Sequence, residues 1–133
     1  MKPVTKRKVA AKPVLKTRSK ADPGLMLARS ISKAISETKG EQIVILDLQK
    51  HPSYADYLVI ASASNTRQVL AISDKIQETI HATTKKWPLG VEGIDNALWI
   101  LVDYGDVVAH IFLEETREFY RLEKLWYDAK RVK

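Results

Sequence analysis

The sequence contains no cysteine, and this absence excludes two kinds of chemistry at once. The 133-residue chain forms no disulfide bond and offers no thiolate as a nucleophile or metal ligand. That composition fits a reducing compartment, and we expect a cytoplasmic protein. No apolar run approaches the ~20 residues that a membrane-spanning helix needs. We therefore expect neither disulfides nor a membrane span.

The chain also lacks the motifs of the common metal, phosphate and catalytic sites. Its three histidines lie far apart and without metal-site spacing, at His51, His81 and His110. Residues 61–67 join a predicted strand to a predicted helix, where backbone N–H groups can hold a phosphate. This junction has no glycine and matches no nucleotide fingerprint, so its polar side chains are better suited to capping the helix. With no nucleophile elbow either, the sequence predicts no catalytic residue, no metal and no cofactor.

Acidic residues are missing from one part of the chain, which makes the net charge of +6 misleading. Residues 1–20 hold eight Lys or Arg and no acid, and the last four residues hold three more. Of the 22 basic residues, 11 therefore remain in residues 21–129, against all 16 acidic ones, so this body carries a net charge of −5. An acidic body suits a basic protein partner, while the basic ends attract phosphates.

These charges divide the chain into a basic N-terminal tail (1–21), one α/β domain (22–129) and a basic C-terminal end (130–133). The tail combines two prolines with little aliphatic content, which is typical of a disordered segment. Three interpretations are open: a solubilising arm, an arm that attracts nucleic acid, or a cleaved organellar transit peptide.

The remaining pattern alternates helices and strands. Asp22 and Pro23 predict the start of a helix over 23–38. Runs rich in β-branched residues predict strands over 43–48 and 56–63, and apolar spacing predicts a helix over 65–83. A short edge strand is expected within 87–93, followed by a hairpin of 98–103 and 107–113 and by a helix to Trp126. The fold class is therefore α/β, with a mixed β-sheet flanked by helices.

The hairpin is the candidate functional element. Period-two alternation places Leu98, Ile100 and Val102 on one face, which we expect to be core. Trp99, Leu101 and Asp103 share the opposite face. Trp99 fits either a second core layer or an exposed aromatic anchor. The closing helix should add Phe119, Leu122 and Trp126 on one apolar face.

Two carboxylates flank the turn of this hairpin, and their roles stay open. Asp103 and Asp106 fit turn chemistry, a contact to Lys or Arg of a partner, or metal and acid–base work. Tyr104 lies at the turn, where a tyrosine gains little from folding, so a binding role would explain it. His110 fits a satisfied core histidine, or alternatively a group that orients a carboxylate of the turn.

Several blocks of the sequence together resemble one family. They are Ile43–Leu48 (IVILDL), Asp56–Ala61 (DYLVIA), Ser64–Gln68 (SNTRQ), Val91–Gly93, Trp99, then DYGDVVAH over 103–110 and REFYRLEKLW over 117–126. In this order and spacing, over about residues 24–128, the chain resembles the ribosomal silencing factor family (RsfS, or Iojap-like).

The resemblance implies a function and a site. Members of the family bind the large ribosomal subunit through ribosomal protein fourteen, sterically block subunit joining and repress translation when nutrients are limiting. Their fold is similar to that of nucleotidyltransferases without the catalytic carboxylates, which implies a protein that is not an enzyme. Carried onto this sequence, the partner surface comprises Trp99, Asp103, Tyr104, Gly105, Asp106 and Val108.

Three further expectations accompany this interpretation. The basic tail is a candidate contact for rRNA. The Trp99 face is compatible with a homodimer in the free protein. The alternative function is a nucleotide-binding or nucleotidyltransferase-like enzyme that uses the helix N-terminus near Asn65.

Overall fold

The computed structural model describes residues 22–50 and 54–132. The predicted tail (1–21) lies outside these residues. In chain order the elements are α1 (Pro23–Glu37), β1 (Glu41–Asp47), β2 (Tyr57–Ala63), α2 (Thr66–Thr84), β3 (Gly90–Glu92), β4 (Trp99–Asp103), β5 (Val107–Leu113), α3 (Glu114–Tyr120), the 3₁₀ helix η2 (Leu122–Trp126) and β6 (Lys130–Val132).

The strands form one six-stranded mixed sheet in the order β3-β4-β5-β2-β1-β6. β2 and β5 are parallel, and the other described pairings are antiparallel. β2 and β5 lie at the centre of the sheet, with almost every residue buried. This confirms the predicted mixed sheet flanked by helices.

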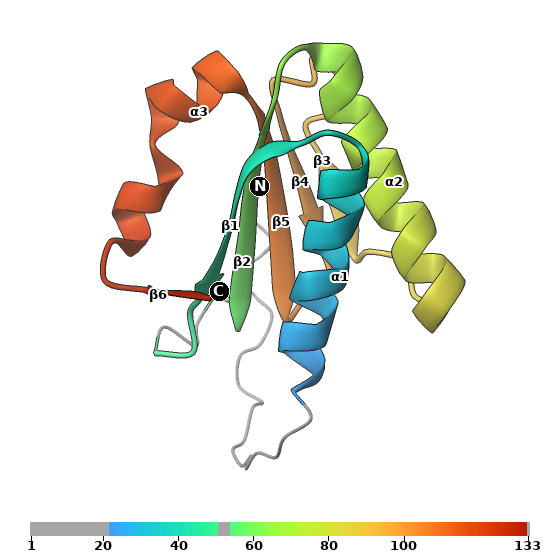
Figure 1. Ribbon diagram of the computed structural model, residues 1–133, viewed down its shortest axis with the longest axis vertical. Coiled ribbons are helices and arrows are strands. Elements are labelled where there is room, and N and C mark those ends of the chain that lie inside the picture. The colour runs from blue at the N-terminus through green and yellow to red at the C-terminus, as the bar shows by residue number, and fades with distance from the viewer. Residues whose placement is uncertain (1–21, 51–53, 133) are drawn as a thin grey trace.

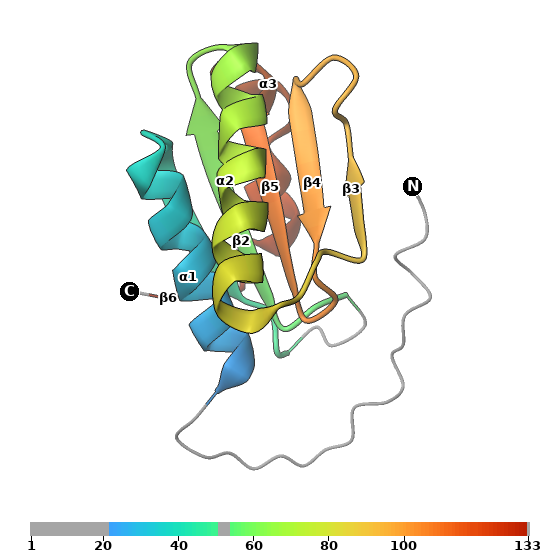
Figure 2. The ribbon, with the colours of Figure 1, turned by 90° about the vertical axis from the view of Figure 1, so that its right-hand side faces the viewer.

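α1 and α2 cover one face of the sheet, and the segment α3–η2 covers part of the other (Figures 1 and 2). The sheet therefore carries two apolar layers. The first layer, under α1 and α2, is built largely from Ile and Val residues of the two helices and of the sheet, such as Ile31, Ile76 and Ile100. The second, under η2, includes Leu58, Val108 and Phe112.

Both long helices begin at the residues that the sequence indicated. The Asp22 carboxylate accepts from the Leu25 N–H at 3.1 Å and caps α1, with Pro23 at its first position. The same carboxylate accepts from the Tyr57 hydroxyl at 2.7 Å, which fastens the start of α1 to β2. Asn65 caps α2 by accepting from the Gln68 N–H at 2.9 Å. The capping interpretation of the 61–67 junction is thus confirmed.

The C-terminal segment differs from the prediction. The expected single helix to Trp126 is broken at Arg121, whose φ of 48° is left-handed, so that α3 ends and η2 begins there. Leu122 and Trp126 pack against the second layer as expected. Phe119 does not share their face: it lies in α3, before the break, and is 79% exposed.

Two smaller differences concern strand ends. Residues Lys130–Val132, which the charge pattern set apart from the domain, pair with β1 as the edge strand β6. Leu98 lies outside β4 and is exposed, so its assignment to the core was wrong, while Ile100 and Val102 are fully buried as predicted. The short edge strand expected within 87–93 is β3.

Candidate partner-binding surface

The structure divides the predicted partner residues between the two sides of the sheet. Trp99 belongs to the second layer, and alternation along β4 places Asp103 on the same side. Tyr104 instead packs against the first layer. Val108 is buried in the second layer and offers no surface, because its neighbours in the sheet and η2 enclose it.

Trp99 anchors a row of aromatic rings. Its ring centroid lies 4.7 Å from that of Phe112 below it and 5.0 Å from that of Tyr120 of α3. Tyr120 in turn meets Phe119 edge-on at 5.1 Å. Tyr120 is 55% and Phe119 79% exposed, whereas Trp99 is half-buried. We call Trp99, Tyr120 and Phe119 the aromatic row. Trp99 is thus part of a core layer and part of an exposed aromatic surface.

His110 holds the indole of Trp99. Trp99 Nε1–H donates to His110 Nδ1 at 2.9 Å, and His110 Nε2 lies 3.2 Å from the Tyr54 hydroxyl. Only 3% of His110 is exposed, and burial lowers its pKa to about 3. It is therefore a neutral, hydrogen-bonded core histidine, as predicted. Its two ring nitrogens face Trp99 and Tyr54, so the structure assigns it no carboxylate of the turn.

The turn between β4 and β5 is stabilised by its own aspartates. Asp103 Oδ1 accepts from the Gly105 N–H at 2.8 Å, and Gly105 has a φ of 93°, which favours glycine. The Asp106 carbonyl accepts from the N–H groups of Asp56 and Tyr57. Asp103 therefore performs turn chemistry, while the Asp106 carboxylate stays exposed.

Tyr104 is not an exposed anchor. Its hydroxyl is buried and has no hydrogen-bond partner among the described residues, and burial raises its pKa to about 12. With Asp106 it lines a cavity of about 440 Å³ between the start of α1 and the end of α2, beside Met26, Ile80 and Lys86. Tyr104 and Asp106 thus face a different part of the surface from Trp99.

The comparisons with known proteins agree with one another. The family model described as "Ribosomal silencing factor during starvation" (RsfS) matches residues 21–133. The chain belongs to the RsfS family. It is 39% identical to a Bacillus subtilis ribosomal silencing factor over 99 residues, which is 72% of this chain and 80% of the relative.

Organellar and structural relatives extend the RsfS match. The chain is 34% identical to the mouse protein "Mitochondrial assembly of ribosomal large subunit protein 1" over 94 residues, 69% of this chain and 41% of that one. A crystal structure of a Chromobacterium violaceum protein superimposes with a TM-score of 0.73 at 31% identity, covering 77% of this chain and 84% of the other.

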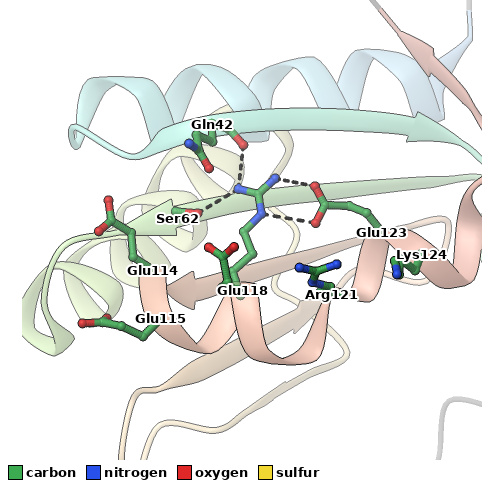
Figure 3. A pocket seen from close by; sticks show the side chains of 9 residues that line it. Gln42, Ser62, Glu114, Glu115, Glu118, Arg121, Glu123 and Lys124 are labelled. Carbon is green, nitrogen blue, oxygen red and sulfur yellow. Dashed lines mark hydrogen bonds and ion pairs between the residues drawn. The ribbon is translucent and has the colours of Figure 1, made fainter.

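A buried arginine lies on the α3 side of this RsfS domain, and sequence reasoning missed it. Arg117 Nη1 donates to the Gln42 carbonyl at 2.7 Å and to Ser62 Oγ at 2.8 Å (Figure 3). Its other nitrogens hold both carboxylate oxygens of Glu123, at 2.7 and 3.3 Å. This pairing lowers the pKa of Glu123.

Arg117 forms the floor of a polar cavity of about 480 Å³, whose rim carries the charged side chains of Glu114, Glu115, Glu118, Arg121 and Lys124 (Figure 3). Its guanidinium is held by hydrogen bonds to Gln42 of β1, Ser62 of β2 and Glu123 of η2, which Figure 3 draws as dashed lines. The arginine thus fastens the α3–η2 segment of the RsfS domain to the sheet.

Neither a metal site nor a membrane helix is found in the part of the chain that the structure describes. Within residues 22–50 and 54–132, no group of three or more His, Asp or Glu is placed to hold a metal ion. None of the described helices is long and apolar enough to cross a membrane.

Proposed function

We propose that this RsfS-family chain binds the large ribosomal subunit through ribosomal protein fourteen and sterically blocks joining of the small subunit, which represses translation when nutrients are limiting. It works by occupying a surface, and not as an enzyme. The family description supports the silencing role, and the name of the mitochondrial relative supports the choice of subunit. The exposed aromatic row on a body of net charge −5 is the observation that carries the proposal.

The aromatic row supplies the apolar anchors of this contact. Interface hot spots are enriched in Trp and Tyr that are surrounded by other side chains and exclude water on binding. Trp99 meets that description, because Phe112 and Tyr120 already enclose part of its ring. Asp103 lies on the same side of the sheet and can accept from a Lys or Arg of the partner. Tyr104 packs against the first layer, on the opposite side of the sheet from Trp99, and is not part of the proposed contact.

Cosedimentation with purified large subunits tests the proposed surface. Truncating a central anchor typically costs ~2 kcal/mol, roughly thirtyfold in affinity. We expect Trp99→Ala and Tyr120→Ala each to weaken binding by about that factor. Tyr127→Ala is the matched control, since Tyr127 is an exposed aromatic outside the row. The wild-type protein should also lower the yield of joined ribosomes when small subunits are added.

The assignment of this surface fails if the folded double variant Trp99→Ala/Tyr120→Ala cosediments like the wild type. The non-enzymatic proposal has its own test, because a bound nucleotide would raise the melting temperature through ligand linkage. We expect no shift with millimolar ATP or GTP and Mg²⁺. A shift that Asn65→Ala abolishes would favour the nucleotide-binding alternative.

The same aromatic row is open to self-association in the free protein. A homodimer built on it would hide the ribosome-binding surface until ribosomal protein fourteen displaced the second copy. Sedimentation equilibrium of the wild type and of Trp99→Ala shows whether such a dimer uses this row.

A further inference from the structure

The indole of Trp99 is held from one side by a buried cross-strand partner. In the β4–β5 ladder Trp99 lies opposite Phe112 and Leu101 opposite His110, so Trp99 and His110 are diagonal neighbours on one face. Diagonal neighbours in antiparallel strands lie within reach of aromatic side chains. Here the two rings meet through a directed N–H···N bond of 2.9 Å.

This bond fixes which nitrogen of His110 carries the proton. An indole N–H only donates, so Nδ1 of His110 must present its lone pair. The neutral ring then carries its proton on Nε2, which donates to the Tyr54 hydroxyl at 3.2 Å. Tyr54 itself stacks on Trp126 of η2, with ring centroids 5.7 Å apart. The chain Trp99–His110–Tyr54–Trp126 thus links β4 to the C-terminal segment.

We propose that His110 is a positioning residue for the ribosome-binding anchor Trp99, holding the indole in the orientation that presents the aromatic row to its partner. This inference rests on the proposed function. The surroundings of Trp99 explain why a hydrogen bond is needed for this. Phe112 and Tyr120 meet the indole as ring–ring contacts, which constrain its orientation less than a directed hydrogen bond does. Burial keeps the histidine neutral, so the acceptor is present throughout the physiological pH range.

Three substitutions of His110 separate positioning from space filling. The amide oxygen of His110→Asn lies near the place of Nδ1 and keeps an acceptor for the indole. The longer His110→Gln replaces Nε2 and keeps the contact to Tyr54, while His110→Leu keeps neither. We expect His110→Asn to bind large subunits within about threefold of the wild type. We expect His110→Gln and His110→Leu to lose roughly tenfold, because each orphans the indole N–H.

A double-mutant cycle with Trp99→Phe adds a readout that a purely structural role would not move. Phenylalanine has no N–H for His110 to hold, so the difference in affinity between the Asn and Leu variants should vanish in that background. If the difference persists, or if His110→Asn binds as weakly as His110→Leu while folded, the positioning role is overturned.

Proton exchange of the indole N–H, followed by ¹⁵N NMR of the full chain, tests the hydrogen bond without a ribosome. The Trp99 indole proton, assigned by its loss in Trp99→Phe, should exchange much more slowly than that of the exposed Trp87. Fast exchange in the wild type would overturn the inference even if every variant of His110 unfolded. Unchanged subunit binding by Trp99→Ala would remove Trp99 as an anchor and would overturn the positioning role with it. Slow indole exchange in a wild-type protein that does not cosediment with large subunits would instead refute the proposed function.

Discussion

Burial of a neutral imidazole couples the stability of the fold to pH at the level of one residue. The ordinary histidine pKa is near 6.5, and in the folded protein that of His110 is about 3. As pH falls below 6.5 the unfolded chain takes up a proton that the folded chain refuses. The contribution of neutral His110 to the free energy of unfolding is complete above pH 6.5 and is lost progressively between pH 6.5 and 3.

We therefore expect the free energy of unfolding to fall by about 2 kcal/mol between pH 7 and pH 5. Urea denaturation at the two pH values measures this difference. His110→Asn cannot titrate in this range and should lose that part of the dependence. An equal fall in the variant would mean that another group is responsible.

Arg117 provides a second residue-level prediction. Arg117→Met would leave the Ser62 hydroxyl, the Gln42 carbonyl and the Glu123 carboxylate without their donor. Removing one member of such a buried pair typically costs ~3 kcal/mol or more. Thermal or urea unfolding should show this loss. Lys124→Met, an exposed neighbour on the rim of the same cavity, should change stability by less than ~0.5 kcal/mol.

Single residues also show where prediction from sequence stops. Trp99 and His110 could each be placed on a strand, but their contact depends on the β4–β5 register, which alternation alone does not fix. Tyr104 was expected outside because it sits in a turn. It points inward because α1 and α2, which are remote in sequence, cover the space beside the turn. Val108 was carried over from family resemblance, which does not record burial.

Among the elements, the break between α3 and η2 is what allows the buried Arg117 to pair with Glu123. Arg117 and Glu123 are six positions apart, and in a continuous helix they would point to different sides and lie roughly 9 Å apart along the axis. The left-handed Arg121 between them brings the two side chains together. Residues 114–126 contain no Gly or Pro that would mark this break, so the sequence predicted a single helix.

The left-handed conformation at Arg121 leads to a stability prediction. Glycine adopts positive φ without steric cost, so Arg121→Gly should stabilise the protein by ~0.5–1 kcal/mol. Glu118→Gly is the matched control within α3, where glycine should instead destabilise by ~1 kcal/mol. Equal destabilisation by both changes in urea unfolding would show that the Arg121 side chain matters more than its backbone.

The helices and strands were the most predictable level of the structure. Asp22 and Pro23 marked the start of α1, Asn65 that of α2, and runs of Val and Ile marked the central strands. β6 was missed because two of its three residues, Lys130 and Arg131, carry charge, and only the unpaired edge of β1 gives the segment a place in the sheet.

For the whole molecule, the separation of charge predicts two contributions to ribosome binding. The acidic body suits a basic ribosomal protein, and the eight basic residues in the first 20 suit rRNA phosphates. Deleting residues 1–21 should weaken binding to large subunits and flatten its dependence on salt, because fewer counterions are released. Cosedimentation from low to high salt measures both effects. Equal affinities of the deleted and full chains at every salt concentration would reject the expected contact between the tail and rRNA.

The pairing of β6 with β1 has a consequence for the order of folding during synthesis. β1 is made early, and its outer neighbour β6 leaves the ribosome only after nearly the whole described chain. Until then β1 presents an open row of N–H and C=O groups, which is a template for pairing with other chains. The Lys and Arg of β6 place charge on the finished edge. Until β6 pairs with it, this edge of β1 is therefore a site at which the nascent chain is prone to aggregate.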